Sequence, residues 1–520
     1  MGELLIGDRY FYLLKDFDSK HLDFTKRTVD KYQQENHPDL YQVGSHQRKN
    51  PHHVWPLGPF MASVSKFILY DCLNILGPID AYHFSIILSA IGLLIILFFF
   101  IEKRWGLREA WFCVLIVALY PRFWAHIHFN FKDVPVTFTY WLTIFTFIYA
   151  MKKKCPGWMY LSGIVWGLAL LCKANAFFLA FILGPYFIIF LLEQRMNKGD
   201  YKIKKPFLIS LIAYPFIGLS IMILFWPILM QDFPTNIYKY FNYLLGRGFE
   251  GQNSWNIAPI LYAVTTIPVV ILAFLFAGIG IILYQMKCKK HIAFNSLLLL
   301  TLIIPVLRVS IPGARDFDGI RHWLEFIPAV ALISTLALHR LISLIAEKMP
   351  KANHQIISLS VIFCLCFLPV TFWNIKNHPY QIVHFNALIG GLKGAQEMKL
   401  PDATDYWGIS YRQGIYWLNK HAEEDSLIVT PIGPLIVFSM SHTDLRDDFK
   451  LLPYKNAGPG RDITAEEFEK EIASIDRHIY YMYVTRTDHY NEFTKKIDSQ
   501  IPVFQVEVDG GIAMKIYKLK

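Results

Sequence analysis

Long apolar stretches recur along most of this sequence and constrain its fold more than any other feature. A helix needs about 20 apolar residues to cross the hydrocarbon core of a bilayer. The candidate spans are 84–101, 110–124, 134–151, 157–171, 176–193, 207–229, 259–285, 292–307, 322–342 and 354–374. Of these, 110–124 and 157–171 are short for a full crossing. Because 54% of the residues are hydrophobic and only 18% are charged, we exclude a soluble globular chain and predict a polytopic membrane bundle of about ten helices.

Lysine and arginine gather in alternate loops between these stretches. The basic positions are Lys103, Arg104, Arg108, Lys152, Lys153, Lys154, Arg195, Lys198, Lys202, Lys204, Lys205, Lys287, Lys289, Lys290, Arg340, Lys348 and Lys351. Positive charge near span ends is retained in the cytoplasm. The intervening loops, among them 125–133, 172–175 and 308–321, and the chain after 374 therefore fall on the extracytoplasmic face. Since part of the net charge of +10 is this topology signal, we do not interpret it as nucleic-acid binding.

Composition divides the chain into three parts. Residues 1–83 form a polar and aromatic outer-face segment, in which "PFMASVSKFILYDCLNILG" carries Lys66 and Asp71 and favours an interfacial helix over a spanning one. Residues 84–374 form the transmembrane bundle. Residues 375–520 are charged and long enough for one soluble extracytoplasmic domain. The predicted fold class is thus mainly α, a membrane helix bundle followed by a C-terminal α/β domain.

The predicted tail domain rests on four local patterns. "SLIVTPIG" and "HIYYMYVTR" are typical of buried strands. "ITAEEFEKEIASI" is amphipathic and predicts a helix capped by Thr464. "VFQVEVDGGIAMKIYKL" predicts a hairpin that turns at Asp509, Gly510 and Gly511.

The segment "HIHFNFKDVPVTF" places ionisable groups between two apolar stretches. Asp133 precedes Val134 and Pro135, so one interpretation is a helix N-cap whose carboxylate accepts backbone N–H groups. The other is a general base or metal ligand held at the membrane surface, and the two interpretations are compatible. His126 and His128 fit either a divalent metal or aromatic packing at the interface. The seven cysteines form no CxxC zinc pattern, and the sequence implies no other cofactor.

Cations accumulate on the same predicted face. Lys173 interrupts the apolar run "LLCKANAFF", where it either reaches to the headgroups or pairs with an anion. The loop "RVSIPGARDFDGIRHW" mixes arginines with Asp316 and Asp318, so it either pairs internally or binds phosphate, which matches the arginine fork. The candidate phosphate ligands are Lys173, Arg308, Arg315, Arg321 and His322.

A carboxylate with lysine and arginine at an outer membrane surface suits group transfer from a lipid-linked phosphate. The departing phosphate gains charge in the transition state, which fixed cations stabilise. The carboxylate removes a proton from the acceptor hydroxyl or amine. Asp133 is therefore the candidate catalytic residue.

Several motifs in order along the chain carry a family resemblance. They are "NPHHVWPLGPF", "FKDVP", "GIVWGLALLCKANAFF", "FWPILMQDFPTN", "FDGIRHWLEFIPA", "HPYQIVHFNALIGGLKGA" and "DYWGISYRQGIYWLN". In these the sequence resembles the bacterial polyprenyl-phosphate-sugar-dependent glycosyltransferases related to protein O-mannosyltransferases and the lipid A aminoarabinose transferase. The resemblance implies a GT-C membrane bundle in the inner membrane with its active site on the extracytoplasmic face. It also implies a dolichyl- or undecaprenyl-phosphate sugar donor, and transfer with inversion to a glycan, lipid or protein of the cell envelope.

The sequence departs from that family at its start. The family carries an Asp-Glu motif just after its first helix, and "LLIGDRYFYLLKDFD" resembles the residues just downstream of it. Glu3 and Asp8 are the only nearby acids, and neither fits the motif. We expect that the first helix and the motif were lost by a late start; an inactive chain is the alternative.

The sequence leaves two other function classes open. A transporter or lipid flippase usually places ionisable groups near the bilayer midplane, whereas here they cluster at predicted outer helix ends. An inactive scaffold for envelope assembly is the other alternative. In the tail, Tyr406, Trp407, Tyr411 and Trp417 fit either a core or stacking on sugar rings, and Tyr406 and Trp407 are the candidate acceptor or sugar contacts together with His126 and His128.

Overall fold

The computed structural model describes most of the chain. The described residues are 2–23, 54–197, 203–248, 251, 253–349, 351–434, 436–437, 440, 444–452 and 464–520. They divide into two compact units: the first runs to Asp316 and resumes over Ile320–Asn374, and the second includes Phe317–Gly319 and Ile375–Lys520.

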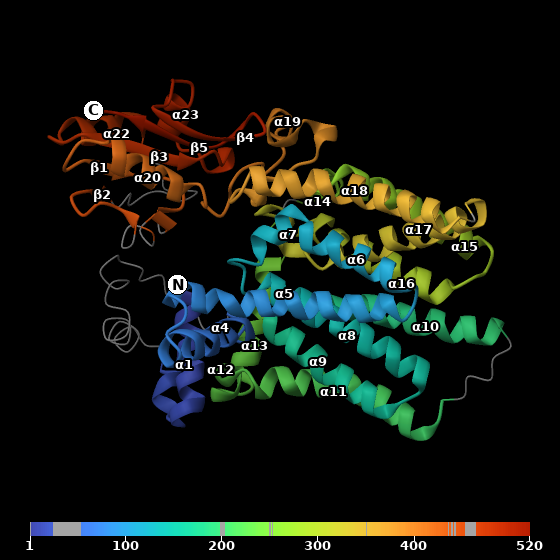
Figure 1. Ribbon diagram of the computed structural model, residues 1–520. Helices are drawn as coiled ribbons and strands as arrows, with labels where there is room; N and C mark the ends of the chain where they lie inside the picture. Colours follow the sequence, from blue (N-terminus) through green and yellow to red (C-terminus); the bar gives the residue numbers. More distant parts are fainter. Residues whose placement is uncertain are drawn as a thin grey trace. The chain divides into compact units, whose positions relative to one another are not determined.

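Helices make up most of the described residues as far as Lys376 (Figure 1). In chain order they are α1 (Gly2–Asp16), η1 (Ser19–Leu22), α4 (Leu57–Lys66), η3 (Phe67–Cys72), α5 (Pro78–Glu102), α6 (Leu107–Leu119), α7 (Pro121–His126), α8 (Asp133–Lys153), α9 (Pro156–Cys172), η4 (Ala174–Leu179), α10 (Ala180–Met196), α11 (Lys205–Leu224), α12 (Pro227–Gln231), α13 (Thr235–Gly248), α14 (Ala258–Thr265), α15 (Val269–Lys287), α16 (Ile292–Ser310), η5 (Gly319–Trp323), α17 (Phe326–Lys348) and α18 (Ala352–Lys376).

Eight helices within the described residues are long and apolar enough to cross a membrane. They cover Pro78–Trp105, Asp133–Lys153, Ala174–Met196, Lys205–Leu224, Val269–Lys287, Ile292–Ser310, Phe326–Lys348 and Ala352–Lys376. The α9 helix is apolar but shorter. The chain is accordingly an integral, multi-pass membrane protein.

Prolines shorten three of the predicted spans. The stretch 110–124 covers most of α6, which has 13 residues and ends before Pro121. Pro227 similarly separates α11 from α12, and Pro268 stands at the N-cap of α15 after a break behind α14. The residue before a proline is restricted to extended conformations, so a helix usually ends there. The apolar pattern correctly located these segments but not their internal breaks.

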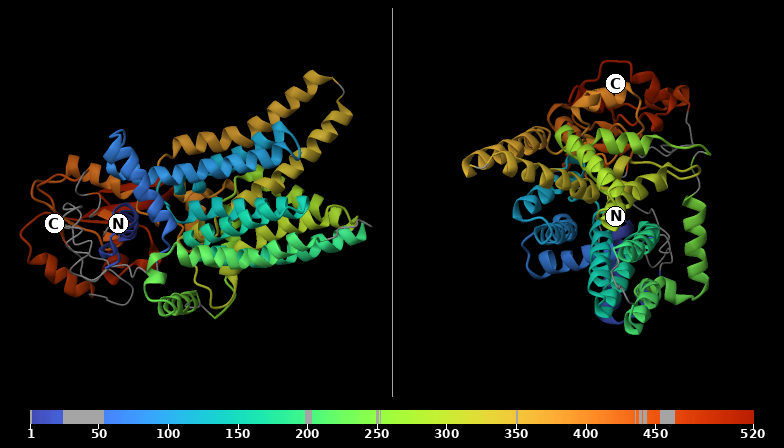
Figure 2. Two further views of the ribbon diagram at one scale, coloured as in Figure 1. Left: turned by 90° about the horizontal axis from the view of Figure 1, so that it is seen from below. Right: turned by 90° about the vertical axis from the view of Figure 1, so that its right-hand side faces the viewer.

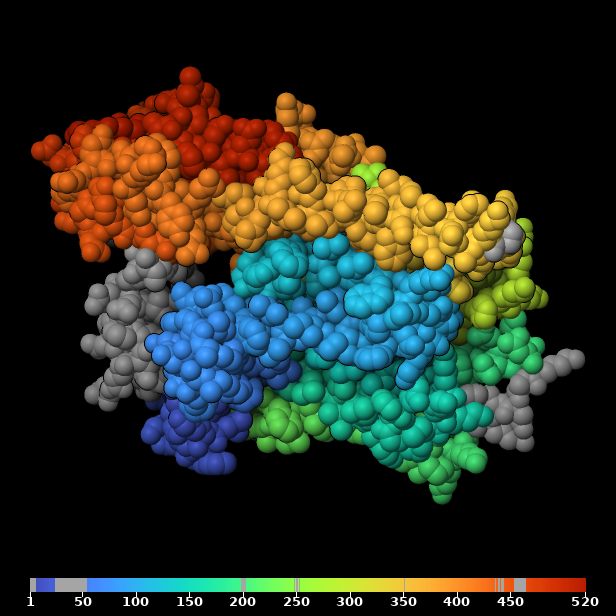
Figure 3. All heavy atoms as spheres, in the orientation of Figure 1, coloured from blue at the N-terminus to red at the C-terminus, as the bar shows by residue number. Residues whose placement is uncertain are grey.

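Neighbouring helices of the first unit run alongside one another. Figures 1 and 2 show α5, α8, α9 and α11 side by side, and Figure 3 shows α5 (blue) lying along the teal helices α8 and α9. The α9 and α11 helices approach closely because glycines face each other's side chains: a Cβ at Gly167 would lie 2.5 Å from Ile221 Cβ, and one at Gly218 would lie 2.2 Å from the Trp166 ring. Small residues at such contacts are a common way to pack membrane helices.

The N-terminal helices pack beside the loop that leads into α8. The predicted interfacial segment forms α4 followed by the π-helical turn η3. Lys66, the last residue of α4, pairs with Asp71 of η3 at 2.8 Å. A Cβ at Gly58 would lie 1.9 Å from the carbonyl oxygen of Phe131, so α4 touches this loop directly. In α1 the carboxylate of Asp8 is buried and accepts a hydrogen bond from Tyr82 Oη at 2.7 Å.

The second unit contains a five-stranded mixed sheet. Its elements are η6 (Gln381–Val383), η7 (Ala387–Ile389), α19 (Gly391–Glu397), α20 (Tyr411–His421), β1 (Leu427–Val429), β2 (Lys450–Leu452), α22 (Ala465–Ala473), β3 (Ile479–Val484), η8 (Thr487–His489), α23 (Glu492–Ile497), β4 (Phe504–Val508) and β5 (Gly511–Lys518). The strand order is β2-β1-β3-β5-β4. Strand β1 runs parallel to β2 and β3, whereas β5 runs antiparallel to β3 and β4. The predicted fold class, a mainly α membrane bundle with a C-terminal α/β domain, is confirmed.

The local predictions for the tail also hold. Thr464 accepts a hydrogen bond from the backbone N–H of Glu467, whose side chain accepts one from the Thr464 N–H, which completes a capping box. The hairpin turns through Asp509 and Gly510, with φ of 49° and 73°, as a two-residue type I′ turn requires.

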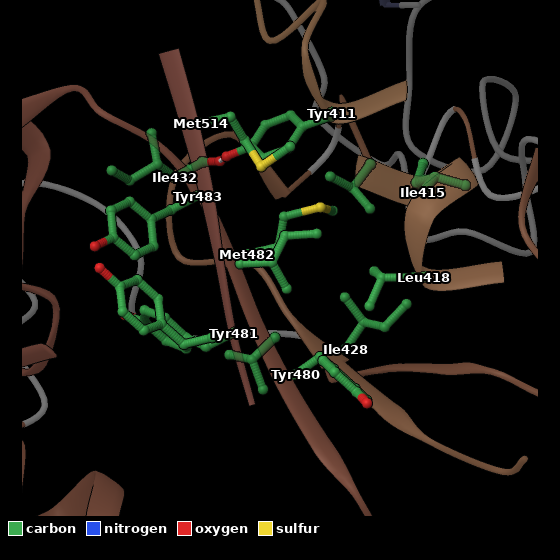
Figure 4. Packing of buried hydrophobic residues seen from close by; sticks show 14 of the residues in the cluster. Tyr411, Ile415, Leu418, Ile428, Ile432, Tyr480, Tyr481, Met482, Tyr483 and Met514 are labelled. Atoms are coloured by element: carbon green, nitrogen blue, oxygen red, sulfur yellow. Dashed lines mark hydrogen bonds between the residues drawn. The ribbon is translucent and has the colours of Figure 1, made fainter. Parts of the chain in front are cut away.

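The sheet is covered on one face by α20 (Figure 4). Tyr411, Ile415 and Leu418 of α20 are fully buried against β3, where Tyr481 and Met482 are also inaccessible. Tyr411 donates a hydrogen bond to the carbonyl of Ile432 and accepts one from the N–H of Val484 at 3.2 Å. Tyr411 is therefore a core residue and not a residue that stacks on sugar rings.

Candidate active site

Asp133 is the first residue of α8 and lies almost completely buried, with 2% of its surface exposed. Asn130, three positions earlier, organises this helix start. Its side-chain oxygen accepts the N–H of Asp133 at 3.0 Å, and its Nδ2 donates to Asp133 Oδ2 at 2.7 Å. The N-cap position itself is Lys132, without a capping side chain. The predicted cap role of Asp133 is thus wrong: Asn130 satisfies the backbone donor, and the carboxylate faces other side chains.

Lys173 is the principal partner of that carboxylate. It stands between α9 and η4 in an extended conformation, and its Nζ donates to Asp133 Oδ1. The same ammonium lies 3.1 Å from Nδ1 of His322. Only 8% of Lys173 is exposed. Burial lowers the pKa of Lys173, and the neighbouring carboxylate opposes that shift.

Arg321 and His322 lie in the last turn of η5, where the predicted stretch 322–342 begins. Burial, followed by the charge of Lys173, holds the pKa of His322 well below its ordinary value. The ring is therefore neutral near pH 7, so Nδ1 accepts the hydrogen bond from Lys173. Arg321 is half-buried, and its positive charge acts on both Asp133 and Lys173.

Arg308 is held in a separate buried network beside this group. It lies in the last turn of α16 and donates to the carbonyl of His322 and, at 3.4 Å, to Glu325 Oε2. Asn175 Nδ2 donates to the same carbonyl at 2.9 Å and to Glu325 Oε1 at 2.8 Å. Glu325, only 1% exposed, thereby ties α16, η4 and the beginning of α17 together.

The two remaining candidate histidines lie in different environments. His126 is fully buried, its Nδ1 lies 3.2 Å from Asn130 Nδ2, and burial lowers its pKa to about 3. His128 is exposed and contacts the Trp124 backbone oxygen through Nδ1 at 2.7 Å. Within the described residues no three His, Cys, Asp or Glu side chains gather as a metal site.

The other predicted residues lie outside the buried group. Arg315 is exposed in the loop after α16. Tyr406 and Trp407 belong to the second unit, where Tyr406 is buried and Trp407 half-buried. Beside them, Asp405 accepts the N–H of Ser410 at 2.6 Å. Trp417 stacks on Phe504 with ring centroids 5.4 Å apart.

Three polar residues of the site were missed in the sequence: Asn130, Asn175 and Glu325. The sequence position of each residue could have indicated its place in the site. Asn130 stands one helical turn before Asp133, and Asn175 stands two residues after Lys173. Glu325 is the only acid in the apolar stretch 322–342, and a lone buried carboxylate requires a partner.

A family comparison covers the helices that supply Asp133 and Lys173. Residues 76–226 match the family "Dolichyl-phosphate-mannose-protein mannosyltransferase". The resemblance predicted from the sequence motifs is confirmed for this mannosyltransferase-family segment. It runs from the residues before α5 to the break between α11 and α12 and contains both members of the buried ion pair.

Two solved structures resemble the chain as a whole. The crystal structure of ArnT from Cupriavidus metallidurans bound to undecaprenyl phosphate is 13% identical, with 92% of each chain covered and a TM-score of 0.47. ArnT from the same organism in the apo state is 12% identical, with 92% of this chain and 91% of that chain covered and a TM-score of 0.45. The search of curated proteins found no match.

Proposed function

We propose that this protein is a membrane glycosyltransferase of GT-C type. It moves a sugar from a polyprenyl-phosphate donor to an acceptor on the extracytoplasmic face of the inner membrane. The observation that carries the proposal is the buried pair formed by the carboxylate of Asp133 and the ammonium of Lys173, both within a segment that matches the mannosyltransferase family. The positive charge of Arg321, which lies outside that segment, acts on both groups.

The cations have the donor phosphate as their natural ligand. Lys173 and Arg321 supply positive charge next to Asp133. Arg308 pairs with Glu325 and donates to the carbonyl of His322. In a buried site such charges act more strongly than in water. They bind the phosphodiester of the donor and stabilise the second negative charge that develops when the sugar leaves.

Asp133 has the role of general base. The acceptor oxygen or nitrogen attacks the anomeric carbon while its proton passes to the carboxylate. The bond between that carbon and the phosphate oxygen breaks, and its electron pair stays on polyprenyl phosphate. Attack occurs opposite the leaving group, so the anomeric configuration inverts. The donor phosphate competes with Asp133 for Lys173, which frees the carboxylate to accept the proton.

His322 and Asn130 set the geometry of these groups. Neutral His322 accepts a hydrogen bond from Lys173, and Asn130 donates to the oxygen of Asp133 that does not face the lysine. Both contacts restrict the rotation of a side chain that must meet the substrate, which is the usual role of such supporting polar residues. Tyr406 and Trp407 stay candidate contacts for the sugar or the acceptor.

Radiolabelled polyprenyl-phosphate sugar incubated with membranes containing the full chain tests the proposal. Transfer of label to an acceptor, lost in an Asp133→Asn variant, is the expected result. Movement of the labelled lipid across vesicles without transfer identifies a flippase instead. Neither transfer nor movement identifies a scaffold, and both of these results contradict the proposal.

A further inference from the structure

A second polar site lies at the opposite ends of the helices that form the candidate active site. It is a cavity of about 420 Å³ lined by Arg104, Lys152, Lys154, Tyr186, Phe190, Glu193, Gln194, His291, Ala293 and Phe294. This volume falls within the roughly 300–1,000 Å³ of small-ligand pockets. Asp133 begins α8 and Lys152 is near its end, so a helix of 21 residues, about 30 Å long, separates the two sites.

Positive charge dominates the cavity. Among the described residues that line it, Arg104, Lys152 and Lys154 accompany one carboxylate, that of Glu193. The Arg104 and Lys152 charges also act on one another unfavourably. Arg104 and Lys152 repel each other unless an anion occupies the cavity, because like charges at close range raise the free energy of the folded state.

Glu193 is already engaged by the protein. Its Oε1 accepts the backbone N–H of Ile292 at 2.6 Å and its Oε2 that of Ala293 at 3.4 Å. These N–H groups belong to the first turn of α16, whose positive end favours a carboxylate. Glu193 therefore caps α16 and neutralises the cavity only in part.

The guanidinium of Arg104 stacks on an aromatic ring. Its guanidinium carbon lies 3.6 Å from the centre of the Phe294 ring. Its Nε is buried and has no hydrogen-bond partner in the part of the chain that the structure describes. A buried donor without an acceptor is costly, and an anionic oxygen in the cavity would satisfy it.

We propose that this cavity binds the phosphate group of an anionic membrane phospholipid such as phosphatidylglycerol. The loops around it are rich in lysine and arginine, which predicts the cytoplasmic face. On that face anionic lipid headgroups attract lysine and arginine. From the cavity α10 continues as an apolar span whose outward side chains include Ile188 and Leu192, 58% and 54% exposed. The acyl chains lie along this surface while the headgroup phosphate enters the cavity.

The test uses the full-length protein in detergent and counts bound phosphatidylglycerol by native mass spectrometry, with phosphatidylcholine as the competing lipid. The double variant Lys152→Gln/Lys154→Gln should bind phosphatidylglycerol more weakly, by roughly fivefold for each charge removed. Lys153→Gln is the matched control, since this neighbouring lysine does not line the cavity, and it should bind as the unmodified protein does.

Two results would overturn the assignment. Equal loss in Lys153→Gln and in the double variant would mean that general surface charge, and not this cavity, attracts the lipid. Inorganic phosphate at millimolar concentration that raises the melting temperature as much as phosphatidylglycerol does, and only when Lys152 and Lys154 are present, would mean that the cavity takes a free anion. Unchanged melting temperatures of the lipid-free variants establish that the substitutions leave the fold intact.

Discussion

The ammonium of Lys173 donates a hydrogen bond to the carboxylate of Asp133, although 40 positions separate the two residues in the chain. One residue begins α8 and the other follows α9, and these two helices pack together along their length. Both side chains are almost fully buried. Burying two ions costs free energy, and removing only one of them leaves an uncompensated charge inside the protein. Substitution of one or both residues therefore tests the stability of the pair as well as its role in the reaction.

Replacing Asp133 by Asn should nearly abolish sugar transfer. The amide cannot accept the acceptor proton, and loss of a general base commonly slows a reaction by about 10²–10⁴-fold. The measurement is the initial rate of label transfer from a polyprenyl-phosphate sugar in membranes. Asp80→Asn is the control, because Asp80 is an exposed acid in the first turn of α5. A wild-type rate in Asp133→Asn would remove this residue from the mechanism.

Replacing Lys173 by Met should destabilise the bundle by about 3–5 kcal/mol, because it leaves a buried carboxylate without its cation. The double variant Lys173→Met/Asp133→Asn should recover most of that loss, since neither charge then remains. Chemical denaturation in mixed micelles measures both. Transfer activity should be absent in both variants, so the double variant should regain stability without regaining activity. A double variant no more stable than Lys173→Met would show that the pair is not coupled.

Glu325→Gln should weaken donor binding more than it slows turnover. Glu325 accepts hydrogen bonds from Arg308 and Asn175 and so positions the Arg308 guanidinium. Loss of a charged hydrogen-bond partner is expected to raise the donor KM by roughly tenfold or more. Steady-state kinetics with varied donor separate KM from kcat. Glu347→Gln, an exposed acid at the far end of the same helix, should change neither; a pure loss of kcat in Glu325→Gln would contradict a positioning role.

The buried ring of His126 should make the protein acid-sensitive below about pH 6.5. Its folded-state pKa is lowered to about 3, whereas in the unfolded chain the ring titrates near its ordinary value of about 6.5. Between these values the unfolded state binds the extra proton, so stability is fully present above pH 6.5 and falls by about 1.4 kcal/mol for each pH unit below it. His322, whose pKa is also lowered, adds to the same trend.

Melting temperatures at pH 7.5 and 5.5 check this expectation. His126→Gln should lose less stability between the two pH values than the unmodified protein does, whatever its absolute stability. His128→Gln is the matched control, because this neighbouring ring is exposed, and its pH response should equal that of the unmodified protein. An identical response in all three proteins would show that His126 does not titrate in this way.

Local pattern was sufficient for much of this protein. Apolar stretches located the membrane helices, and the short apolar and aromatic run "HIYYMYVTR" located β3. Thr464 and Asp509 marked a helix start and a hairpin turn where the structure has them. These features are encoded by neighbours in sequence, because helix periodicity, capping and turn geometry each depend on a few adjacent residues. The sequence also identified Asp133, Lys173 and Arg308 as polar groups at the ends of apolar stretches.

Tertiary structure decided which of these groups meet. The contact of Asp133 with Lys173, the Glu325 clamp on Arg308 and the exposure of Arg315 depend on how helices pack, and residues adjacent in sequence do not specify it. The side-chain oxygen of Asn130 accepts the backbone N–H of Asp133, and this contact depends on how the chain folds just before α8. An apolar stretch determines that a helix is buried in a membrane, but interhelical packing determines which polar side chains share its interior.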